Sequence, residues 1–100
     1  MIRGTTPTIR LVFKYTLDFL SDYDITFSQE DDVVLVKKKD EISVDKNIMS
    51  VQLTDKETLL FDDEKLFGYQ VRGKTNDGKV IATRIKYNYV YDILNEDILL

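Results

Sequence analysis

The residues that could carry chemistry in this sequence are carboxylates, lysines and tyrosines, because the chain contains no His and no Cys. Histidine most often transfers protons near neutral pH and ligates most zinc sites. The lack of Cys excludes disulfides, thiolate metal sites and Cys nucleophiles. We therefore predict that the chain is not an enzyme and has no catalytic residues, no cofactor and no metal site.

Three short acidic clusters allow one enzymatic alternative, a small hydrolase that uses carboxylates. They are Asp31 with Asp32, residues 62–64, and Glu96 with Asp97. Two carboxyls facing each other across a cleft can hydrolyse glycosides, and acidic loops can bind calcium, although no EF-hand spacing occurs here. Each cluster falls where a turn is expected, and turns are commonly acidic and solvated. We therefore interpret the clusters as solvated turns.

A run of tyrosines near the end of the chain is the best candidate binding surface. Tyr87, Tyr89 and Tyr91 alternate with other residues in "KYNYVY", so one strand face would carry all three. They could form an exposed aromatic ridge that binds carbohydrate, peptide or protein, since Tyr is enriched at interfaces. They could also lie in or near the core with their hydroxyls at its rim, and this interpretation is favoured.

The charge balance argues against nucleic acid as a partner. The chain has 14 basic and 18 acidic residues, for a net charge of −4. Binding to phosphate backbones needs clustered Lys and Arg. The one basic run, residues 37–39, is followed at once by Asp40 and Glu41. We interpret this run as a solvated strand end.

Length and composition predict one soluble domain over residues 1–100. The chain is 43% hydrophobic and 32% charged, with one Pro and four Gly, which fits a folded domain without a flexible linker. No stretch approaches the roughly 20 apolar residues of a membrane span, and no signal peptide is visible. We therefore expect no membrane partner and synthesis in the cytoplasm.

The elements that must position these residues are mostly strands. Alternation of apolar and polar side chains, which is typical of strands with one buried face, recurs along the chain. The predicted strands cover 9–15, 23–28, 33–38, 41–44, 48–53, 65–75 and 79–91. On the last of these, Ile81, Ile85 and the tyrosines share one parity. Gly68 and Gly73 are expected to mark a bulge or a close backbone contact.

Turn and cap residues punctuate these strands. Residues 76–78, Asn-Asp-Gly, are the strongest hairpin feature, and Thr54 with Glu57 fits a capping box on a short helical turn at about 55–60. That turn is expected to cross from one sheet to the other. The link at 16–22 is ambiguous and could form one turn of helix. The tail from residue 92 could add another turn or pack loosely.

About seven short strands with turns every 8–12 residues predict an all-β fold. The expected architecture is an antiparallel β-sandwich, broadly immunoglobulin-like, with one short helical turn. A small β-barrel is the alternative. The Cys pair and core Trp of antibody domains are absent, so the prediction depends on strand number and spacing.

Three stretches resemble a group of small proteins from phage and prophage structural-gene regions of Firmicutes. They are "RGTTPTIRLVF" at 3–13, "ITFSQEDDVVLVKK" at 25–38 with "LTDKETLLF" at 53–61, and "GYQVRGKTNDGKVIATRIKYNYVYDIL" at 68–94. The group typically carries an R-G-T-T-P-T start, a T-F-x-Q strand, an L-T-x-E-x-T-L-x-F segment and a Q-x-R-x-x-x-x-D-G-x-x-x-A-S/T hairpin. This chain departs from it in the Tyr-rich final strand and at Gly73.

The resemblance implies a small phage-related β-sandwich and supplies no catalytic residues. The first functional hypothesis is therefore a non-enzymatic structural or interaction protein of a virion or of its assembly, acting through protein–protein contacts that include self-association. The alternative is a stand-alone carbohydrate- or peptide-binding module that uses Tyr87, Tyr89 and Tyr91. In the motifs, Gly78 is expected to make the turn, and Phe27 and Phe61 to pack together.

Overall fold

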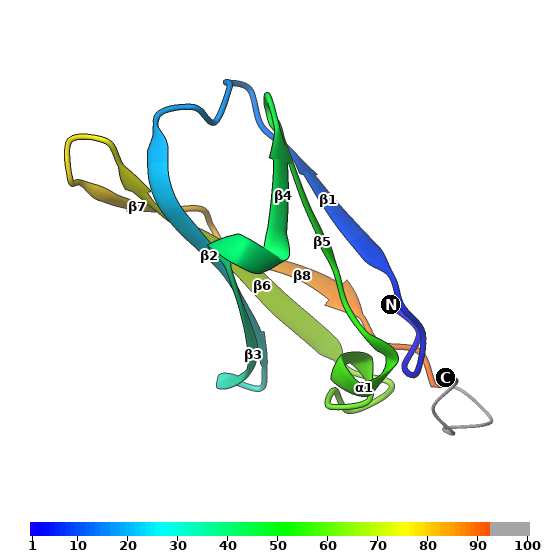
Figure 1. Cartoon of the computed structure of the whole chain (residues 1–100). Coiled ribbons are helices and arrows are strands. Elements are labelled where there is room, and N and C mark those ends of the chain that lie inside the picture. The colour runs from blue at the N-terminus through cyan, green and yellow to red at the C-terminus, as the bar shows by residue number, and fades with distance from the viewer. Residues whose placement is uncertain (93–100) are drawn as a thin grey trace.

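The computed structural model describes residues 1–92 and folds them into two packed antiparallel sheets (Figure 1). The smaller sheet contains β1 (Thr8–Val12), β4 (Ile42–Asp45) and β5 (Ile48–Gln52). The larger sheet contains β2 (Leu20–Gln29), β3 (Asp32–Lys38), β6 (Leu66–Thr75), β7 (Val80–Ala82) and β8 (Lys86–Tyr89). The predicted all-β sandwich is confirmed.

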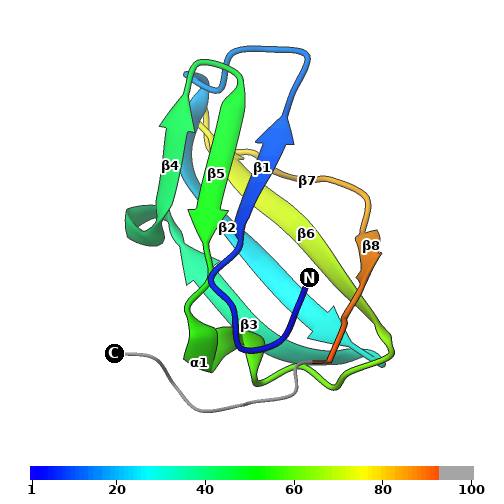
Figure 2. The ribbon, with the colours of Figure 1, turned by 90° about the vertical axis from the view of Figure 1, so that its right-hand side faces the viewer.

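The strand order is that of an immunoglobulin-like sandwich. The smaller sheet runs β1-β5-β4, and the larger runs β3-β2-β6, with β7 and β8 both paired to β6. If β1 is strand B, the two sheets correspond to B-E-D and C′-C-F-G. Figure 2 shows the smaller sheet in front of the larger one. Because the chain has no Cys, no disulfide joins these sheets.

The core lies between the sheets and is centred on three phenylalanines. The rings of Phe27 and Phe61 meet edge to face with centroids 6.3 Å apart, and those of Phe61 and Phe67 lie 5.5 Å apart. Such pairs stabilise a fold by about 0.5–1.5 kcal/mol beyond area burial. The predicted packing of Phe27 with Phe61 is confirmed. The buried apolar side chains are Leu17, Ile25, Phe27, Ile42, Met49, Val51, Leu53, Phe61, Phe67, Val71 and Val90.

The β2–β3 turn has an unusual sequence for its conformation. Gln29 pairs with Asp32 across a two-residue loop, and both loop residues, Glu30 and Asp31, have positive φ angles of 50° and 69°. Two successive positive φ angles are typical of a type I′ turn, in which Asn and Gly are favoured. The turn expected at this acidic cluster lies at residues 30–31, with Asp32 already in β3, and its type could not have been predicted from a sequence without Gly.

Short helical segments join the two sheets. The 3₁₀ turn η1 (Lys39–Glu41) connects β3 to β4, and α1 (Asp55–Thr58) connects β5 to β6. Thr54 Oγ1 accepts from the N–H of Glu57 at 3.1 Å, and Glu57 Oε1 accepts from the N–H of Thr54 at 2.8 Å. The predicted capping box and crossover are confirmed. The ambiguous link before β2 forms a turn, closed by the Leu20 N–H to Leu17 carbonyl bond of 3.2 Å, rather than a helix.

The predicted return strand at 79–91 is interrupted by one extra residue. Ala82 lies opposite Arg72, and Lys86 lies opposite Tyr69, so four steps along one strand match three along the other. Such an insertion is a β-bulge. The predicted seventh strand is therefore two strands, β7 and β8, which pair in turn with β6.

The bulge reverses which residues face the core, so the prediction that Ile81 and the tyrosines share one face is wrong. Ile81 pairs with Gly73, on the parity that points toward the smaller sheet. Tyr87 pairs with Gly68, on the opposite parity. After the bulge it is Val90, an even-numbered residue, that is fully buried.

The first residues of the chain lie beside the last described ones. Ile2 and Tyr91 form a parallel bridge, and the Arg3 N–H donates to the Tyr91 carbonyl at 2.9 Å. The chain then turns through Pro7 and enters β1 of the other sheet. Of the tail predicted from residue 92 onward, residues 93–100 lie outside the described residues. No helix within residues 1–92 is long and apolar enough to cross a membrane.

Candidate functional site

The tyrosines predicted as a binding surface divide between exposed and half-buried positions. Tyr87 on β8 is 65% exposed, Tyr91 just beyond it is 55% exposed, and Tyr89 is half-buried. The rings of Tyr89 and Tyr91 meet edge to face at 4.9 Å. The favoured interpretation of all three as core residues is wrong for Tyr87 and Tyr91. Val90 between them takes the buried position.

Tyr87 belongs to the surface of the larger sheet that points away from the smaller sheet. This surface, called the outer face below, carries the even-numbered residues from 22 to 28 on β2 and from 66 to 74 on β6. Register and burial assign it, because the odd-numbered Ile25, Phe27, Phe67 and Val71 are buried in the core. Val33, Val36, Ile85 and Tyr87 complete it from the flanking segments.

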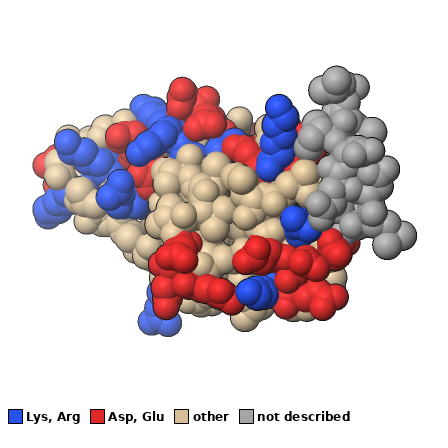
Figure 3. Space-filling model, turned by 90° about the horizontal axis from the view of Figure 1, so that it is seen from below, with Lys and Arg blue, Asp and Glu red and all other residues tan. Residues whose placement is uncertain are grey.

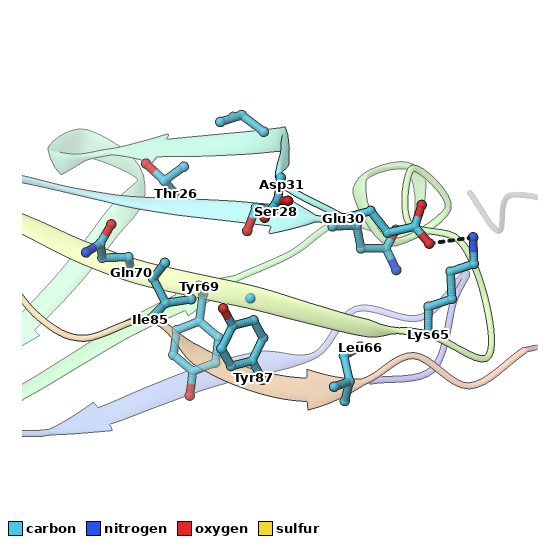
Figure 4. A pocket seen from close by; sticks show the side chains of 13 residues that line it. Thr26, Ser28, Glu30, Asp31, Lys65, Leu66, Tyr69, Gln70, Ile85 and Tyr87 are labelled. Atoms are coloured by element: carbon cyan, nitrogen blue, oxygen red, sulfur yellow. Dashed lines mark ion pairs between the residues drawn. The ribbon is translucent and has the colours of Figure 1, made fainter.

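A hollow lined in part by Gly68 lies in the middle of the outer face. A Cβ at Gly68 would lie 2.9 Å from Ile85 Cγ2, 3.1 Å from Ser28 Oγ and 3.1 Å from Tyr87 Cε1. The predicted close contact at Gly68 is therefore confirmed. The hollow above it has a volume of about 600 Å³. Figure 4 shows Ile85 and Tyr87 on one side of it and Thr26 and Ser28 on the other.

Three hydroxyls around this hollow are not used by the fold. The hydroxyls of Thr26, Ser28 and Tyr87 make no hydrogen bond to the described part of the chain. The Gln70 side chain makes one hydrogen bond, which its amide N–H donates to the Thr83 carbonyl at 2.8 Å. Glu30 and Lys65 close one end of the hollow with an ion pair of 3.0 Å. The hydrogen bond that Lys65 donates to Glu30, followed by the charge of Glu30, raises the pKa of Lys65.

Exposed apolar side chains surround the hollow. Val33 is 65% exposed and Leu66 58% exposed, and Val36 and Ile85 are also exposed. Figure 3 looks onto the side of the molecule where the larger sheet lies, and shows an uncharged area bordered by basic and acidic side chains. An apolar centre with a charged rim is the usual anatomy of a protein interface.

Charges on the outer face are sorted by strand. Asp24 on β2 lies opposite Arg72 on β6, and its Oδ2 accepts from Arg72 Nη2 at 2.8 Å. This hydrogen bond, and then the charge of Asp24, raises the pKa of Arg72. Asp22 lies opposite Lys74 in the same way. The acids therefore follow β2 and the bases follow β6.

Lys37, the first residue of the basic run at 37–39, is buried. The interpretation of this run as a solvated strand end is therefore wrong for Lys37. Lys37 is 5% exposed, and its Nζ contacts Glu57 at 2.7 Å and Glu41 at 3.4 Å. Burial alone lowers the pKa of Lys37, but the hydrogen bonds and charges of Glu57 and Glu41 outweigh it and leave the pKa raised. Lys37 thus joins β3 to α1 and η1.

Two motifs of the family resemblance have structural roles. The guanidinium of Arg3 donates to the Phe61 carbonyl at 2.7 Å and to the Leu59 carbonyl at 3.3 Å, just beyond α1. The side chain of Gln29 accepts from the Asp62 N–H at 2.7 Å and donates to the Asp62 carbonyl at 2.8 Å. These residues fix the loops between the sheets and lie apart from the hollow.

Smaller cavities also occur within the described residues, including one of about 170 Å³ beside Asp22, Arg72 and Lys74. One of about 330 Å³ lies between β1 and β6, beside Tyr69 and Lys86. Another of about 160 Å³ is apolar and lies where Phe13, Leu20 and Ile81 meet. Within residues 1–92 no group of three or more acidic side chains is arranged to hold a metal ion, and Glu96 and Asp97 lie outside that range.

The sequence analysis did not place Val33 on the candidate surface, and it placed Ile81 on the same face as the tyrosines, because both faces depend on bulges. One bulge interrupts β2–β3 pairing after Phe27, and the other follows Ala82. A clue was available for the second. Ile81 and Val90 are both apolar but have opposite parity, so an extra residue must lie between them if both face inward.

Fold and surface together define an immunoglobulin-like β-sandwich with an apolar, hollowed outer face on its larger sheet. Comparisons of the chain with protein-family models, with curated proteins and with solved structures find no match. The family suggested by the sequence motifs therefore stays a prediction.

Proposed function

We propose that this chain is a non-enzymatic interaction protein that binds other proteins through the outer face of its larger sheet. The observation that carries the proposal is the group of large apolar side chains exposed there, namely Val33, Val36, Leu66, Ile85 and Tyr87. Large contiguous apolar patches are rare on monomeric proteins unless they serve an interaction. Tyrosine in particular is enriched where such patches meet a partner.

The sequence resemblance supports a more specific form of this proposal. In that form the protein is a structural or assembly component of a phage or prophage particle, and its partners are other proteins of the particle. The outer face supplies a surface of the kind that such a component needs.

Mass spectrometry of particles purified after induction of the source strain tests this function. We expect the protein in the particles at a fixed ratio to their other components. Val33→Asp should remove it from the particles, because a charge would enter the apolar patch. Val12→Asp is the matched control, since Val12 is 71% exposed on the outer side of the other sheet. Absence of the wild-type protein, or normal incorporation of Val33→Asp, would contradict the proposal.

A second candidate function is binding of a carbohydrate or a polar peptide in the hollow above Gly68. The unused hydroxyls of Thr26, Ser28 and Tyr87 favour it, because they surround a space next to an exposed aromatic ring. Titration with a panel of soluble oligosaccharides, followed by NMR chemical shifts, tests it. A ligand that binds wild type, and not a folded Tyr87→Ser variant, would support this function over the first.

A further inference from the structure

We infer that the outer face binds a second copy of this chain, related by a two-fold axis that runs parallel to the strands between β2 and β6. The inference rests on the proposed function and names the partner. Such an axis places β2 of one copy over β6 of the other at the same height along the strands. Each contact is then made twice, as two-fold symmetry requires.

The charges on the outer face are complementary under this operation. Since acids follow β2 and bases follow β6, acids of one copy meet bases of the other. Asp24 is buried and pairs with Arg72 of its own chain at 2.8 Å, so this pair stays within each copy. The facing pairs between copies are Asp22 with Lys74 and Glu30 with Lys65.

The apolar residues are complementary in the same arrangement. β3 of one copy lies over β8 of the other. Val33 of one copy therefore meets Tyr87 of the other, and Val36 of one copy meets the residues around Ile85 of the other. Ser28 of one copy lies over Gly68 of the other. Packed sheets are about 10 Å apart. At that distance Val33 of each copy can enter the hollow beside Tyr87 of the other.

The alternative two-fold axis, perpendicular to the strands, is disfavoured by the same charges. It would place each strand over itself, so that bases on β6 meet bases and acids on β2 meet acids. Lys65 would approach Arg72 and Lys74 of the other copy. Like charges brought together across an interface oppose binding.

The size of the face indicates a weak dimer. The strands are about 4.8 Å apart; β2 and β6 are about 33 Å long and the flanking strands are shorter, which gives a footprint of about 550 Å² per copy, or about 1,100 Å² in total. That is the lower end for specific interfaces. We therefore expect association to be measurable between about 10 µM and 1 mM, and to weaken as salt concentration rises.

Sedimentation equilibrium with charge-reversal variants tests the arrangement. Asp22→Lys alone sets a base against Lys74 of the other copy, and Lys74→Glu alone sets an acid against Asp22 of the other copy. Each variant should dimerise about tenfold more weakly than wild type. An equimolar mixture of the two variants should recover wild-type affinity, because every facing pair in the mixed dimer is again of opposite charge. Weakening without recovery in the mixture would overturn this symmetry.

A second comparison keeps the inference separate from the proposed function. Val33→Asp should abolish the dimer, whereas Val12→Asp, with a similarly exposed valine changed, should leave it intact. A wild-type chain that stays monomeric to about 1 mM, or a Val33→Asp variant that dimerises normally, would overturn self-association. If the chain is monomeric while Val33→Asp alone is still lost from particles, the proposed function stands with a different protein as partner.

Discussion

At the scale of single residues, the buried ion pair of Lys37 and Glu57 connects the larger sheet to the helical crossover. The two side chains lie 2.7 Å apart, and the same Glu57 carboxylate completes the capping box of α1. Burial alone raises the pKa of Glu57, but the hydrogen bond from Lys37 and the bond to the Thr54 backbone outweigh it, so the pKa is lowered. This pair therefore stabilises the folded state over the neutral pH range.

Glu57→Gln should lower the free energy of unfolding by about 1–3 kcal/mol, because it leaves the Lys37 ammonium buried with a weaker partner. Glutamine can still accept from the Thr54 N–H, so the cap is kept and the loss reports on the ion pair. Urea denaturation at neutral pH measures it. Lys56→Gln, on the exposed side of α1, should change stability by less than about 0.5 kcal/mol. Equal effects of the two changes would contradict the role of the pair.

The same pair predicts a pH dependence. Because the folded pKa of Glu57 lies below its ordinary value of 4.5, its contribution is present above pH 4.5 and is lost as the pH falls through the folded pKa. The raised pKa of Lys37 keeps its contribution present below 10.5, and it is lost as the pH rises further. The stability difference between wild type and Glu57→Gln should thus shrink below pH 4.5, as thermal unfolding across pH would show. A difference that stays constant far into the acid range would argue against it.

At the scale of elements, the bulge between β7 and β8 decides which side chains form the candidate surface. Thr83 holds it on both sides, since its N–H donates to the Val71 carbonyl at 2.9 Å and its hydroxyl accepts from the Val71 N–H at 3.1 Å. The threonine side chain thus replaces a ladder partner for Val71. Without this extra residue Tyr87 would point into the core.

Thr83→Val should lower the free energy of unfolding by about 1–2 kcal/mol, because the Val71 N–H loses its acceptor while the shape of the side chain is kept. Thr26→Val is the control, since the Thr26 hydroxyl makes no hydrogen bond to the described residues. That change should be nearly neutral. Urea denaturation of both variants measures the difference, and equal destabilisation would show that the Thr83 hydroxyl does not hold the bulge.

Most elements could be predicted from the sequence, because strand alternation and cap chemistry are local. The Thr54–Glu57 box, the hairpin at 76–78 and the strand at 65–75 all agree closely with α1, the β6–β7 turn and β6. The candidate surface could not be predicted in the same way. The faces of Val33 and Tyr87 depend on single-residue insertions, and these follow from tertiary pairing rather than from local preference.

At the scale of the whole molecule, the N-terminal segment closes the sandwich. Arg3 connects this segment to the two carbonyls that follow α1, and the Gly4 N–H donates to the buried Thr58 hydroxyl at 2.9 Å. The Thr58 hydroxyl in turn donates to the Thr5 carbonyl at 2.9 Å. The R-G-T start is therefore explained by its contacts with residues more than 50 positions away.

Arg3→Lys should lower the free energy of unfolding by about 1–2 kcal/mol, because an ammonium cannot reproduce the fork that meets the Phe61 and Leu59 carbonyls. In a domain of this size, each kcal/mol of lost stability lowers Tm by about 4–8 °C. Differential scanning calorimetry measures it. Arg10→Lys, on the exposed side of β1, is the matched control and should leave Tm nearly unchanged. A similar shift for both would contradict the anchoring role of Arg3.

The pairing of residues 1–3 with residues 89–91 has a consequence for how the protein is made. The Met1 nitrogen donates to the Tyr89 carbonyl at 2.9 Å, so the part of the domain that leaves the ribosome first has its partners almost at the domain's other end. This contact cannot form until the last described strand has been translated. Folding of the domain is therefore completed only late in its own translation.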